Sequence, residues 1–552
     1  MSELRGLGVR LLFALVLAVA ALTGLDDLRR PLANPDEGRY SEISREMAQG
    51  GDWVTPRLNG IRYFEKPPLQ YWASAASFLA FGVNEPAARL YTMLCGALTL
   101  LLMAYTAWRL SGPLLALGTV MVLLSSPYFL VMGGVVTLDM GLTLWTTATF
   151  CAFVLAERPG IDRGGRRAWL LAGWAAMALA VLSKGLIGIV FPAAAIGMQA
   201  ILKRDLRRLL RLEWVLGLVI FLAIAVPWFV AVSRANPTFL EFFFIHEHFA
   251  RFTSTVHRRN EPWWYFLPIF FVLGFLPWFL ALPGAIRRAW RDPQGRPETP
   301  ALQLALLWAF FIVAFFSASG SKLPSYVLPA LPPMALVLGR YLVEAPLRTL
   351  ARYVAPTAIV GLVLTIVAAW LIPATTRDPW SRELFLQARP LGILAGVALL
   401  AAPLAAAVLF WRERRWAGML VAALGVVAMV GFSVNIYDHL SPRQSGLVVA
   451  QKMKPYLTPE ARVYQVKIYD QTLPFYIGRT TRLVDYGDEF ETGLRIEPGL
   501  NIERWPQLAA EWLRPGEALA IMHPEIYAKL RTEGLPMQVL HEDPRRVLVR
   551  KP

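Results

Sequence analysis

Long apolar runs separated by short polar loops are the dominant pattern along the chain. Fourteen such stretches can be marked, and most are close to the roughly 20 residues that a helix needs to cross the hydrocarbon core. They cover residues 9–24, 69–82, 86–108, 113–132, 139–156, 168–183, 185–202, 214–232, 263–284, 302–317, 324–343, 353–373, 389–410 and 416–436. This pattern predicts a polytopic α-helical membrane protein.

Basic residues gather in four of the connecting loops. The clusters lie within 158–167, 203–211, 287–296 and 412–415. Because cytoplasmic loops carry an excess of lysine and arginine, these four loops are predicted to be cytoplasmic. The intervening loops must then face outward, and they are 133–138, 183–185, 233–262, 318–323 and 374–388.

The stretch 69–82 breaks this alternation. Residues 9–24 are interpreted as a first membrane anchor rather than a signal peptide, so residues 25–68 emerge outside. The stretch 86–108 also begins outside. An even number of crossings must therefore lie between residues 25–68 and 86–108. Only 69–82 is available there, so it cannot be a single full crossing. The run 69–82 is short and follows Pro67 and Pro68, so it is predicted to be interfacial or re-entrant. The prediction is therefore about 13 transmembrane helices, with the N-terminus inside and the C-terminus outside.

The end of the chain has a different pattern. Short β-like runs at 462–468, 518–522 and 546–549 alternate with helical runs at 505–513 and 524–530. We therefore expect two domains. The first, 1–436, is transmembrane and carries the outer loop 25–68 with juxtamembrane helices. The second, 437–552, is a soluble α/β domain on the outer side of the membrane.

Composition supports the membrane class and narrows the partners. Hydrophobic residues make up 56% and charged residues only 17%, against about 25% charged in a soluble protein. The net charge of +16 comes mostly from short loops between spans, so we expect membrane lipids and no nucleic acid as partners. The two cysteines, Cys95 and Cys151, lie in apolar segments and predict no disulfide framework.

The first outer loop contains a predicted helix with two possible roles. Asn34 or Asp36 would cap a helix that runs through Met47 and ends at Gly50-Gly51. Its face of Tyr40, Ile43 and Met47 would lie on the membrane surface. For Asp36 alone, a helix cap and a functional carboxylate remain open alternatives.

Charged residues recur at the outer ends of the apolar stretches. Asp139 begins one of them, so it could meet Asp36 in one outer cavity. Cations stand in four outer loops: Lys66, Lys184, Arg251 and Lys322. A lone lysine such as Lys184 either reaches the membrane interface or pairs with an anion. Several cations on one face would suit a lipid phosphate.

The sequence also contains a candidate metal site. His246 and His248 are separated by one residue, and together with Glu65 they could hold a divalent ion. A solvated pair at the membrane interface is the alternative.

Five segments resemble a known family. They are 36–40 (Asp-Glu-Gly-Arg-Tyr), 63–69 (Tyr-Phe-Glu-Lys-Pro-Pro-Leu), 137–139 (Thr-Leu-Asp), 182–185 (Leu-Ser-Lys-Gly) and 322–326 (Lys-Leu-Pro-Ser-Tyr). The first two resemble the first outer loop of the GT-C glycosyltransferases. Within that superfamily the segments most resemble the bacterial lipid A 4-amino-4-deoxy-L-arabinose transferases. The resemblance covers the membrane part of the chain.

The resemblance implies a GT-C fold and transfer of aminoarabinose from undecaprenyl phosphate to a lipid A phosphate, with inversion at the sugar carbon. It places the reaction on the periplasmic face of the bacterial inner membrane and implies lipopolysaccharide modification and polymyxin resistance.

The implied catalytic carboxylates are Asp36 and Asp139. The implied carrier-phosphate and substrate residues are Arg39, Tyr63, Lys66, Lys184, Arg251, Lys322 and Tyr326. Glu65 and His246 match a metal position, which suggests zinc. The first loop lacks a strict Asp-x-Asp, so no metal is expected to be required.

The chemistry favours a phosphate acceptor, which is already anionic and needs no general base, whereas a sugar or protein hydroxyl needs one. The cations would then stabilise a leaving phosphate, and Asp36 or Asp139 would bind the ammonium group of the aminosugar. Two alternatives remain. One is an enzyme like the polyprenyl-phosphate-dependent protein mannosyltransferases, and the other is a lipid flippase or transporter.

Overall fold

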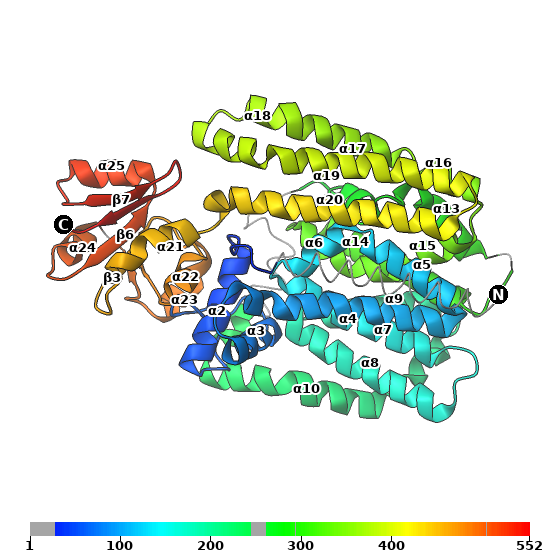
Figure 1. Cartoon of the computed structure of the whole chain (residues 1–552). Helices are drawn as coiled ribbons and strands as arrows, with labels where there is room; N and C mark the ends of the chain where they lie inside the picture. The colour runs from blue at the N-terminus through cyan, green and yellow to red at the C-terminus, as the bar shows by residue number, and fades with distance from the viewer. Residues whose placement is uncertain (1–27, 244–260, 293, 504) are drawn as a thin grey trace.

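A bundle of long helices stands beside a smaller α/β domain (Figure 1). The structure, a computed structural model, describes residues 28–243, 261–292, 294–503 and 505–552. The predicted anchor at 9–24 lies outside the described residues.

The first outer loop contains α2 (Asp36–Gly50), β1 (Arg57–Leu58), β2 (Ile61–Arg62) and α3 (Leu69–Phe81). The bundle contains α4 (Glu85–Ser111), α5 (Pro113–Leu124), α6 (Pro127–Gly134), α7 (Leu138–Ala156), α8 (Arg163–Lys184), α9 (Ile187–Leu202), η1 (Leu206–Arg211), α10 (Trp214–Ala235), α12 (Phe266–Pro268), η3 (Ile269–Leu273), η4 (Phe279–Ala281), α13 (Leu282–Arg291), α14 (Thr299–Ala318), η5 (Pro324–Ala330), α15 (Leu331–Glu344), α16 (Leu347–Val354), α17 (Thr357–Ile366), η6 (Val367–Leu371), α18 (Ile372–Thr375), α19 (Pro379–Trp411) and α20 (Arg415–Gln444).

The polytopic membrane class is confirmed. Among the described residues, eight helices are long and apolar enough to cross a membrane, and the bent pair α5 and α6 would be a ninth span. The number of thirteen crossings stays a prediction. The helix α3 has 13 residues, or about 20 Å at 1.5 Å per residue. It is too short to cross, which agrees with the interpretation of 69–82 as an interfacial segment.

Two apolar stretches that were expected to be single spans are interrupted. The helices α5 and α6 meet at an angle of 69°, because Pro127 starts a new helix whose first turn is capped by Ser126. The stretch 263–284 is divided into the short pieces α12, η3 and η4, with Pro268 and Pro277 at the breaks. Proline lacks the backbone N–H that continues a helix, which explains both interruptions.

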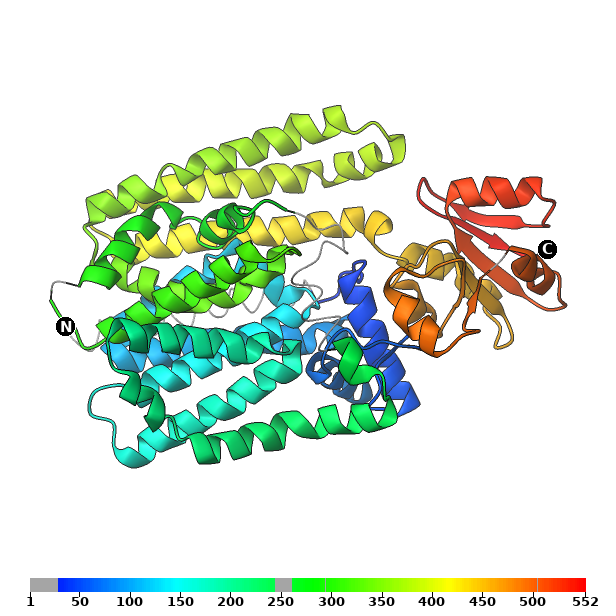
Figure 2. The same cartoon turned by 180° about the vertical axis from the view of Figure 1, so that it is seen from behind.

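The loops divide between the two ends of the bundle as the charge pattern predicts. In both views, the turns between α7 and α8 and between α19 and α20 lie at the end away from the C-terminal domain (Figures 1 and 2). The turn between α18 and α19 lies at the same end as α2, α3 and that domain. This turn is shorter than the predicted loop 374–388, because Asp378 caps α19 and the helix begins at Pro379.

The C-terminal domain is built on one mixed sheet. Its elements are α21 (Leu447–Met453), η7 (Lys454–Tyr456), β3 (Arg462–Val466), α22 (Leu473–Ile477), β4 (Arg482–Val484), η8 (Asp488–Phe490), α23 (Glu491–Ile496), β5 (Asn501–Ile502), α24 (Trp505–Trp512), β6 (Ala518–Met522), α25 (Pro524–Thr532), β7 (Gln538–Glu542) and β8 (Val547–Arg550). The strand order is β5-β4-β3-β6-β8-β7. β5, β4, β3 and β6 run parallel, whereas β8 is antiparallel to β6 and β7. The predicted α/β class of this domain is confirmed.

Alternating residues of the central strands fill two separate cores. Tyr464 and Val466 of β3 lie in a cluster on one face of the sheet, and Val463 lies in a cluster on the other. Every residue of β6 is buried, as expected for a strand covered on both faces. The preceding helix α20 continues to Gln444, past the domain boundary that was expected at 436.

The first outer loop packs against the C-terminal domain. Tyr40, Ile43 and Met47 of α2 are buried in one cluster with Tyr469 and Phe475 of that domain. The prediction that this face of α2 lies on the membrane surface is therefore wrong. The face is apolar because another part of the same chain covers it.

Candidate functional site

The start of α2 carries the first group of predicted site residues. Pro35 occupies the N-cap position and no side chain caps the helix, so the predicted capping by Asn34 or Asp36 is wrong. The Asn34 amide instead donates to Asp470 at 2.9 Å, and its oxygen accepts from the backbone N–H of Thr472 at 3.2 Å. The helix ends as predicted, at Gly51 with φ of 71°. The Asp36 carboxylate is thus available for other contacts.

Glu37 is the centre of a buried ionic network. Its carboxylate accepts hydrogen bonds from Arg30 at 2.8 and 3.1 Å and from Arg89 at 2.9 Å on each oxygen. Burial would raise the pKa of Glu37, but the two guanidinium groups outweigh it and hold the pKa at about 2. Removing one member of such a network typically costs about 3–5 kcal/mol, because a buried charge loses its partner.

The same carboxylate fixes the second outer loop. Glu37 also accepts from the backbone N–H of Val136 at 3.1 Å, and Arg30 donates to the carbonyl of Gly134 at 2.8 Å. Leu138 lies in the buried cluster that contains Tyr40 and the rest of the apolar face of α2. These contacts determine where α7 begins, and therefore where Asp139 lies.

Asp139, Lys184 and Tyr326 come together from three separate elements. Asp139 is in the first turn of α7 and Lys184 is the last residue of α8, so each charge lies at the helix end whose dipole favours it. The Lys184 ammonium forms an ion pair with the Asp139 carboxylate. It also lies 4.5 Å from the centre of the Tyr326 ring, within cation–π range. Both charged side chains are largely buried, with side-chain exposures of 11% and 7%.

A second charged group joins α2 to the C-terminal domain. Arg39 forms ion pairs with Asp36 at 3.0 Å and with Glu489 at 2.6 Å. Gln471 donates to the other oxygen of Glu489 at 2.8 Å. The Asp36 side chain is 40% exposed, whereas Arg39 and Glu489 are mostly covered. Arg39 thus has one partner on its own helix and one on the C-terminal domain.

Tyrosines surround this second group. Burial raises the pKa of Tyr63 and of Tyr40 well above the usual range, although the nearby Arg39 guanidinium acts in the opposite direction. Both phenols therefore stay protonated and can donate hydrogen bonds at neutral pH.

Two more of the predicted site lysines, Lys66 and Lys322, lie within the described residues. The Lys66 ammonium donates to the carbonyl of Glu65 at 2.9 Å. The buried Lys322 ammonium donates to the carbonyl of Ser319 at 2.6 Å. Of the predicted site lysines, Lys184 therefore contacts two other predicted site residues, Asp139 and Tyr326. Lys322 contacts the backbone of its own loop instead.

The predicted metal position is only partly within the described residues. His246 lies outside them, as do His248 and Arg251. In the described part of the chain, no group of three or more His, Cys, Asp or Glu side chains could hold a metal ion. The assignment of Glu65 and His246 to a metal stays a prediction.

Sequence reasoning missed the residues that hold the site together. Arg89 carried a usable signal, because an arginine within an apolar stretch needs a buried partner. Glu37 appeared in the sequence analysis only as a member of the segment 36–40, beside Asp36, and was given no role of its own. Gln471 and Glu489 carried no signal, since their contacts with the first loop depend on how the C-terminal domain docks.

Comparisons with known proteins agree with this arrangement. The family described as "Aminoarabinose transferase C-terminal domain" matches residues 449–551, and the family described as "Dolichyl-phosphate-mannose-protein mannosyltransferase" matches residues 8–243. The chain is similar to undecaprenyl phosphate-alpha-4-amino-4-deoxy-L-arabinose arabinosyl transferases. The identity is 36% to the Edwardsiella ictaluri protein over 56% of each chain, and 33% to the Erwinia tasmaniensis protein over 78% of each.

A solved structure extends the similarity to nearly the whole chain. The crystal structure of ArnT from Cupriavidus metallidurans bound to undecaprenyl phosphate has 34% identity and a TM-score of 0.91. The match covers 98% of this chain and 97% of that one. The bundle, the first outer loop and the C-terminal domain therefore occur together in that protein as they do here.

Proposed function

The chain belongs to the undecaprenyl phosphate-aminoarabinose arabinosyl transferases, and on that premise we propose that it moves 4-amino-4-deoxy-L-arabinose from undecaprenyl phosphate to a phosphate of lipid A. The enzyme class is a glycosyltransferase that uses a polyprenyl-phosphate sugar donor. The observation that carries the assignment of the reacting site is the contact of Lys184 with Asp139 and Tyr326 at the outer ends of three elements.

The proposed reaction exchanges one phosphate for another at the sugar. An oxygen of the lipid A phosphate attacks C1 of the sugar from the face opposite the carrier. The bond between C1 and the carrier oxygen breaks, and undecaprenyl phosphate leaves with the bonding electrons. The configuration at C1 inverts. No proton has to be removed, because the attacking phosphate is already an anion at neutral pH.

The barrier is then mainly electrostatic, since two phosphates must approach each other while charge develops on the leaving group. In the proposed complex Lys184 contacts the carrier phosphate, and Asp139 and the Tyr326 ring hold the lysine in position. A charged donor preorganised in this way is typically worth a factor of about 10²–10³ in rate. Lys66, Lys322 and Arg251 are proposed to add positive charge for the same phosphates.

Asp36 is proposed to recognise the aminosugar. Its carboxylate is partly exposed and is held by Arg39, so it could accept the ammonium group of the sugar without moving. Arg39 and the protonated Tyr63 are proposed to hold the donor nearby. The metal assignment of Glu65 and His246 is kept as a proposal, and the proposed transfer uses only the charged side chains of the chain.

The proposed location is the bacterial inner membrane, with the site and the C-terminal domain in the periplasm. The helices α2 and α3 lie at the same end of the bundle as that domain, and the arginine-rich turns between α7 and α8 and between α19 and α20 lie at the other end (Figures 1 and 2). The expected consequence in the cell is lipopolysaccharide with fewer net negative charges, and so resistance to cationic peptides such as polymyxin.

Transfer to a protein hydroxyl is the second candidate, favoured by the match of residues 8–243 to the mannosyltransferase family. That reaction needs a general base. The Asp139 carboxylate is already engaged in an ion pair with Lys184, so this arrangement does not leave it free to contact an acceptor hydroxyl as that base. The two candidates differ in product, since only the first adds aminoarabinose to lipid A.

The test is the change Lys184→Gln in the full chain. We expect transfer from undecaprenyl phosphate-aminoarabinose to lipid A to fall at least 100-fold, because the leaving phosphate loses its charged donor. The readouts are the rate with purified enzyme and the mass spectrum of lipid A from cells. Lys452→Gln is the matched control, because it makes the same change at an exposed lysine of the C-terminal domain.

Full transfer by Lys184→Gln, at normal protein levels in the membrane, would contradict the assigned role of Lys184. A wild-type enzyme that glycosylates a peptide but not lipid A would instead overturn the proposed acceptor.

A further inference from the structure

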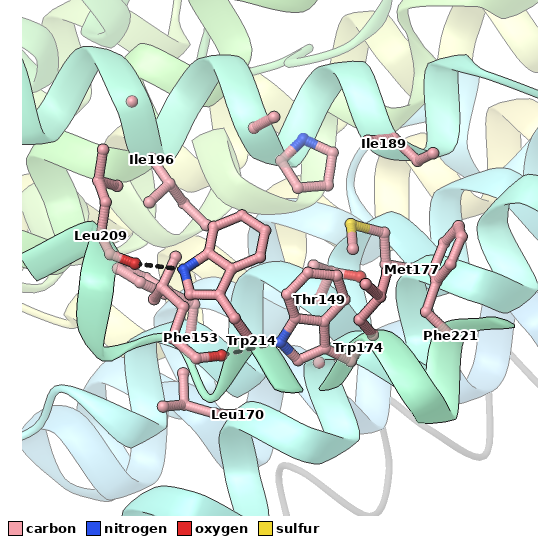
Figure 3. Close-up of a pocket in the computed structure, with 16 residues that line it drawn as sticks. Thr149, Phe153, Leu170, Trp174, Met177, Ile189, Ile196, Leu209, Trp214 and Phe221 are labelled. Atoms are coloured by element: carbon pink, nitrogen blue, oxygen red, sulfur yellow. Dashed lines mark hydrogen bonds between the residues drawn. The ribbon is translucent and has the colours of Figure 1, made fainter. Parts of the chain in front are cut away.

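An apolar groove opens between α7, α8, α9 and α10 (Figure 3). Its volume is about 380 Å³, within the range of roughly 300–1,000 Å³ that is typical of ligand pockets. Met177 of α8 and Ile189 and Ile196 of α9 line it. Its outer edge is accessible, because Trp214 and Leu218 of α10 are about half exposed. In a membrane this opening faces lipid.

Two tryptophans form one wall of the groove without exposing a polar group to it. The Trp174 and Trp214 rings lie edge to face with centroids 5.1 Å apart. The Trp174 indole donates to the carbonyl of Leu212 at 2.8 Å, and the Trp214 indole donates to the carbonyl of Leu209 at 2.7 Å (Figure 3). Their polar edges are thus satisfied by the backbone of one segment, and the groove is left apolar. Paired indoles of this kind are typical of the membrane interface.

A basic cluster adjoins the groove. Four arginines and two carboxylates line a second hollow, and these are Glu157, Arg163, Arg166, Asp205, Arg208 and Arg211. The two hollows share a boundary, because the Arg208 guanidinium lies 5.1 Å from the centre of the Phe153 ring and Phe153 lines the groove. One end of an apolar groove is therefore strongly positive.

The cluster carries a net positive charge, because its four arginines outnumber its two carboxylates. Glu157 is shared by Arg166 at 2.9 Å and Arg208 at 3.2 Å, so one carboxylate faces two guanidinium groups and the trio keeps a positive charge. Arg163 and Arg211 are exposed and have no ion-pair partner within the part of the chain that the structure describes. Exposed arginines beside an apolar groove are suited to a phosphate whose apolar chains enter the groove.

The groove is distant from the reacting groups. Asp139 lies in the first turn of α7, whereas Phe153 lies 14 residues further on, which is about 21 Å along the helix at 1.5 Å per residue. Trp174 lies ten residues before Lys184 on α8, or about 15 Å. The carrier phosphate at Lys184 and a phosphate at the arginine cluster would thus lie near opposite membrane surfaces.

We propose that the groove and the cluster together bind an anionic glycerophospholipid of the leaflet opposite the active site. An acyl chain fills the groove between α8, α9 and α10, and the headgroup phosphate contacts Arg163 and Arg211. The bound lipid holds the segment of η1 against the ends of α7 and α8. The proposal does not depend on the transfer reaction and assigns no role in it.

The test measures lipid binding to the full chain in detergent. The probe is phosphatidylglycerol, compared with phosphatidylethanolamine carrying the same acyl chains, by native mass spectrometry and by the shift in melting temperature. Gly197→Phe fills the groove, since a Cβ at this α9 position meets only open space. The paired change Arg163→Gln with Arg211→Gln removes the two uncompensated charges. We expect affinity for phosphatidylglycerol to fall at least ~10-fold for the first and about 30-fold for the second.

Matched controls exist on the same bundle. Gly431→Phe adds the same side chain to an open helical position of α20, outside the groove. Arg412→Gln with Arg414→Gln removes two exposed arginines from another loop at the same end. Both controls should bind phosphatidylglycerol like the wild type. Equal binding of the two lipids by the wild type, or equal loss in the controls, would overturn the proposal. So would a groove occupant that proves to be a polyprenyl phosphate.

Discussion

At the scale of single residues, a compact group of charges joins α2 to the C-terminal domain. Arg45 and Glu42 form a buried ion pair at 2.6 Å, and Arg45 also donates to the carbonyl of Gly478 at 3.0 Å. Glu46, one turn further along α2, accepts from the backbone N–H of Gly60 at 2.8 Å. Burial, reinforced by the nearby Glu42 carboxylate, raises the pKa of Glu46 to about 8. Near neutral pH, Glu46 is therefore mostly protonated in the folded protein.

This pKa predicts how stability depends on pH. In the unfolded chain Glu46 ionises with its usual pKa of about 4.5, so between pH 4.5 and 8 the folded state binds more protons than the unfolded state. The contribution of Glu46 to stability is fully present below pH 4.5 and is lost as the pH rises through 8. We expect Glu46→Gln to reduce the fall in melting temperature between pH 6 and pH 9, because glutamine keeps the acceptor oxygen and cannot ionise.

The comparison uses Glu491→Gln, which makes the same change at an exposed glutamate of α23. Its melting temperature should follow the wild type at each pH. A Glu46→Gln variant with an unchanged pH profile would show that Glu46 does not titrate in this range.

Several residues of the site could be predicted individually, because a charged side chain beside an apolar stretch is unusual. Asp139 and Lys184 are charges at the ends of apolar stretches, and the structure joins them. Their contact could not be predicted, since the two residues are 45 positions apart. The link from Glu37 to Val136 spans 99 positions and depends on a backbone N–H that has no sequence signature.

At the scale of elements, the contact between α2 and the C-terminal domain depends on one glycine. A Cβ at Gly38 would lie 2.6 Å from the backbone carbon of Gln471 and 2.7 Å from the backbone nitrogen of Thr472. Backbone atoms cannot move aside as a flexible side chain can. Gly38 therefore permits the close approach that brings Gln471 and Glu489 to Arg39.

Gly38→Ala is expected to weaken this contact. Overpacking against fixed backbone typically costs about 1–3 kcal/mol, which should appear as a lower melting temperature of the full chain and as faster proteolysis of the C-terminal domain. Gly50→Ala is the matched control on the same helix, because a Cβ there meets nothing within 4 Å. Alanine at this position should leave stability unchanged or raise it by up to about 1 kcal/mol. Equal stability of the two variants would show that α2 and the domain do not pack this closely.

The elements themselves were predictable to the extent that local pattern determines them. The run 518–522 became the strand β6 with the expected bounds, because a continuous apolar run suits a strand buried on both faces. The stretch 263–284 was wrongly expected to be one helix, since its apolar residues hide the interruptions made by two prolines. The apolar face of α2 was assigned to the membrane because a buried interface and a lipid surface have the same residue pattern.

At the scale of the whole molecule, the two ends of the bundle differ in chemistry. One end carries the site and the C-terminal domain, and the other carries the arginine-rich turns (Figure 1). Hydropathy and charge alone predicted this alternation, because both are properties of whole stretches rather than of single contacts. The docking of the domain on α2 could not be predicted in this way.

The two-ended arrangement predicts which positions can be labelled from outside the cell membrane. The native cysteines Cys95 and Cys151 are buried, so they should give little background. A single cysteine placed by Glu525→Cys, on α25 of the C-terminal domain, should react with a membrane-impermeant maleimide once the outer membrane is opened. One placed by Arg412→Cys, in the turn between α19 and α20, should react only after the inner membrane is also disrupted.

Both positions are exposed, so accessibility alone does not distinguish them. Reaction of both cysteines from the same side would contradict the proposed orientation, because an odd number of crossings could not then separate the domain from that turn.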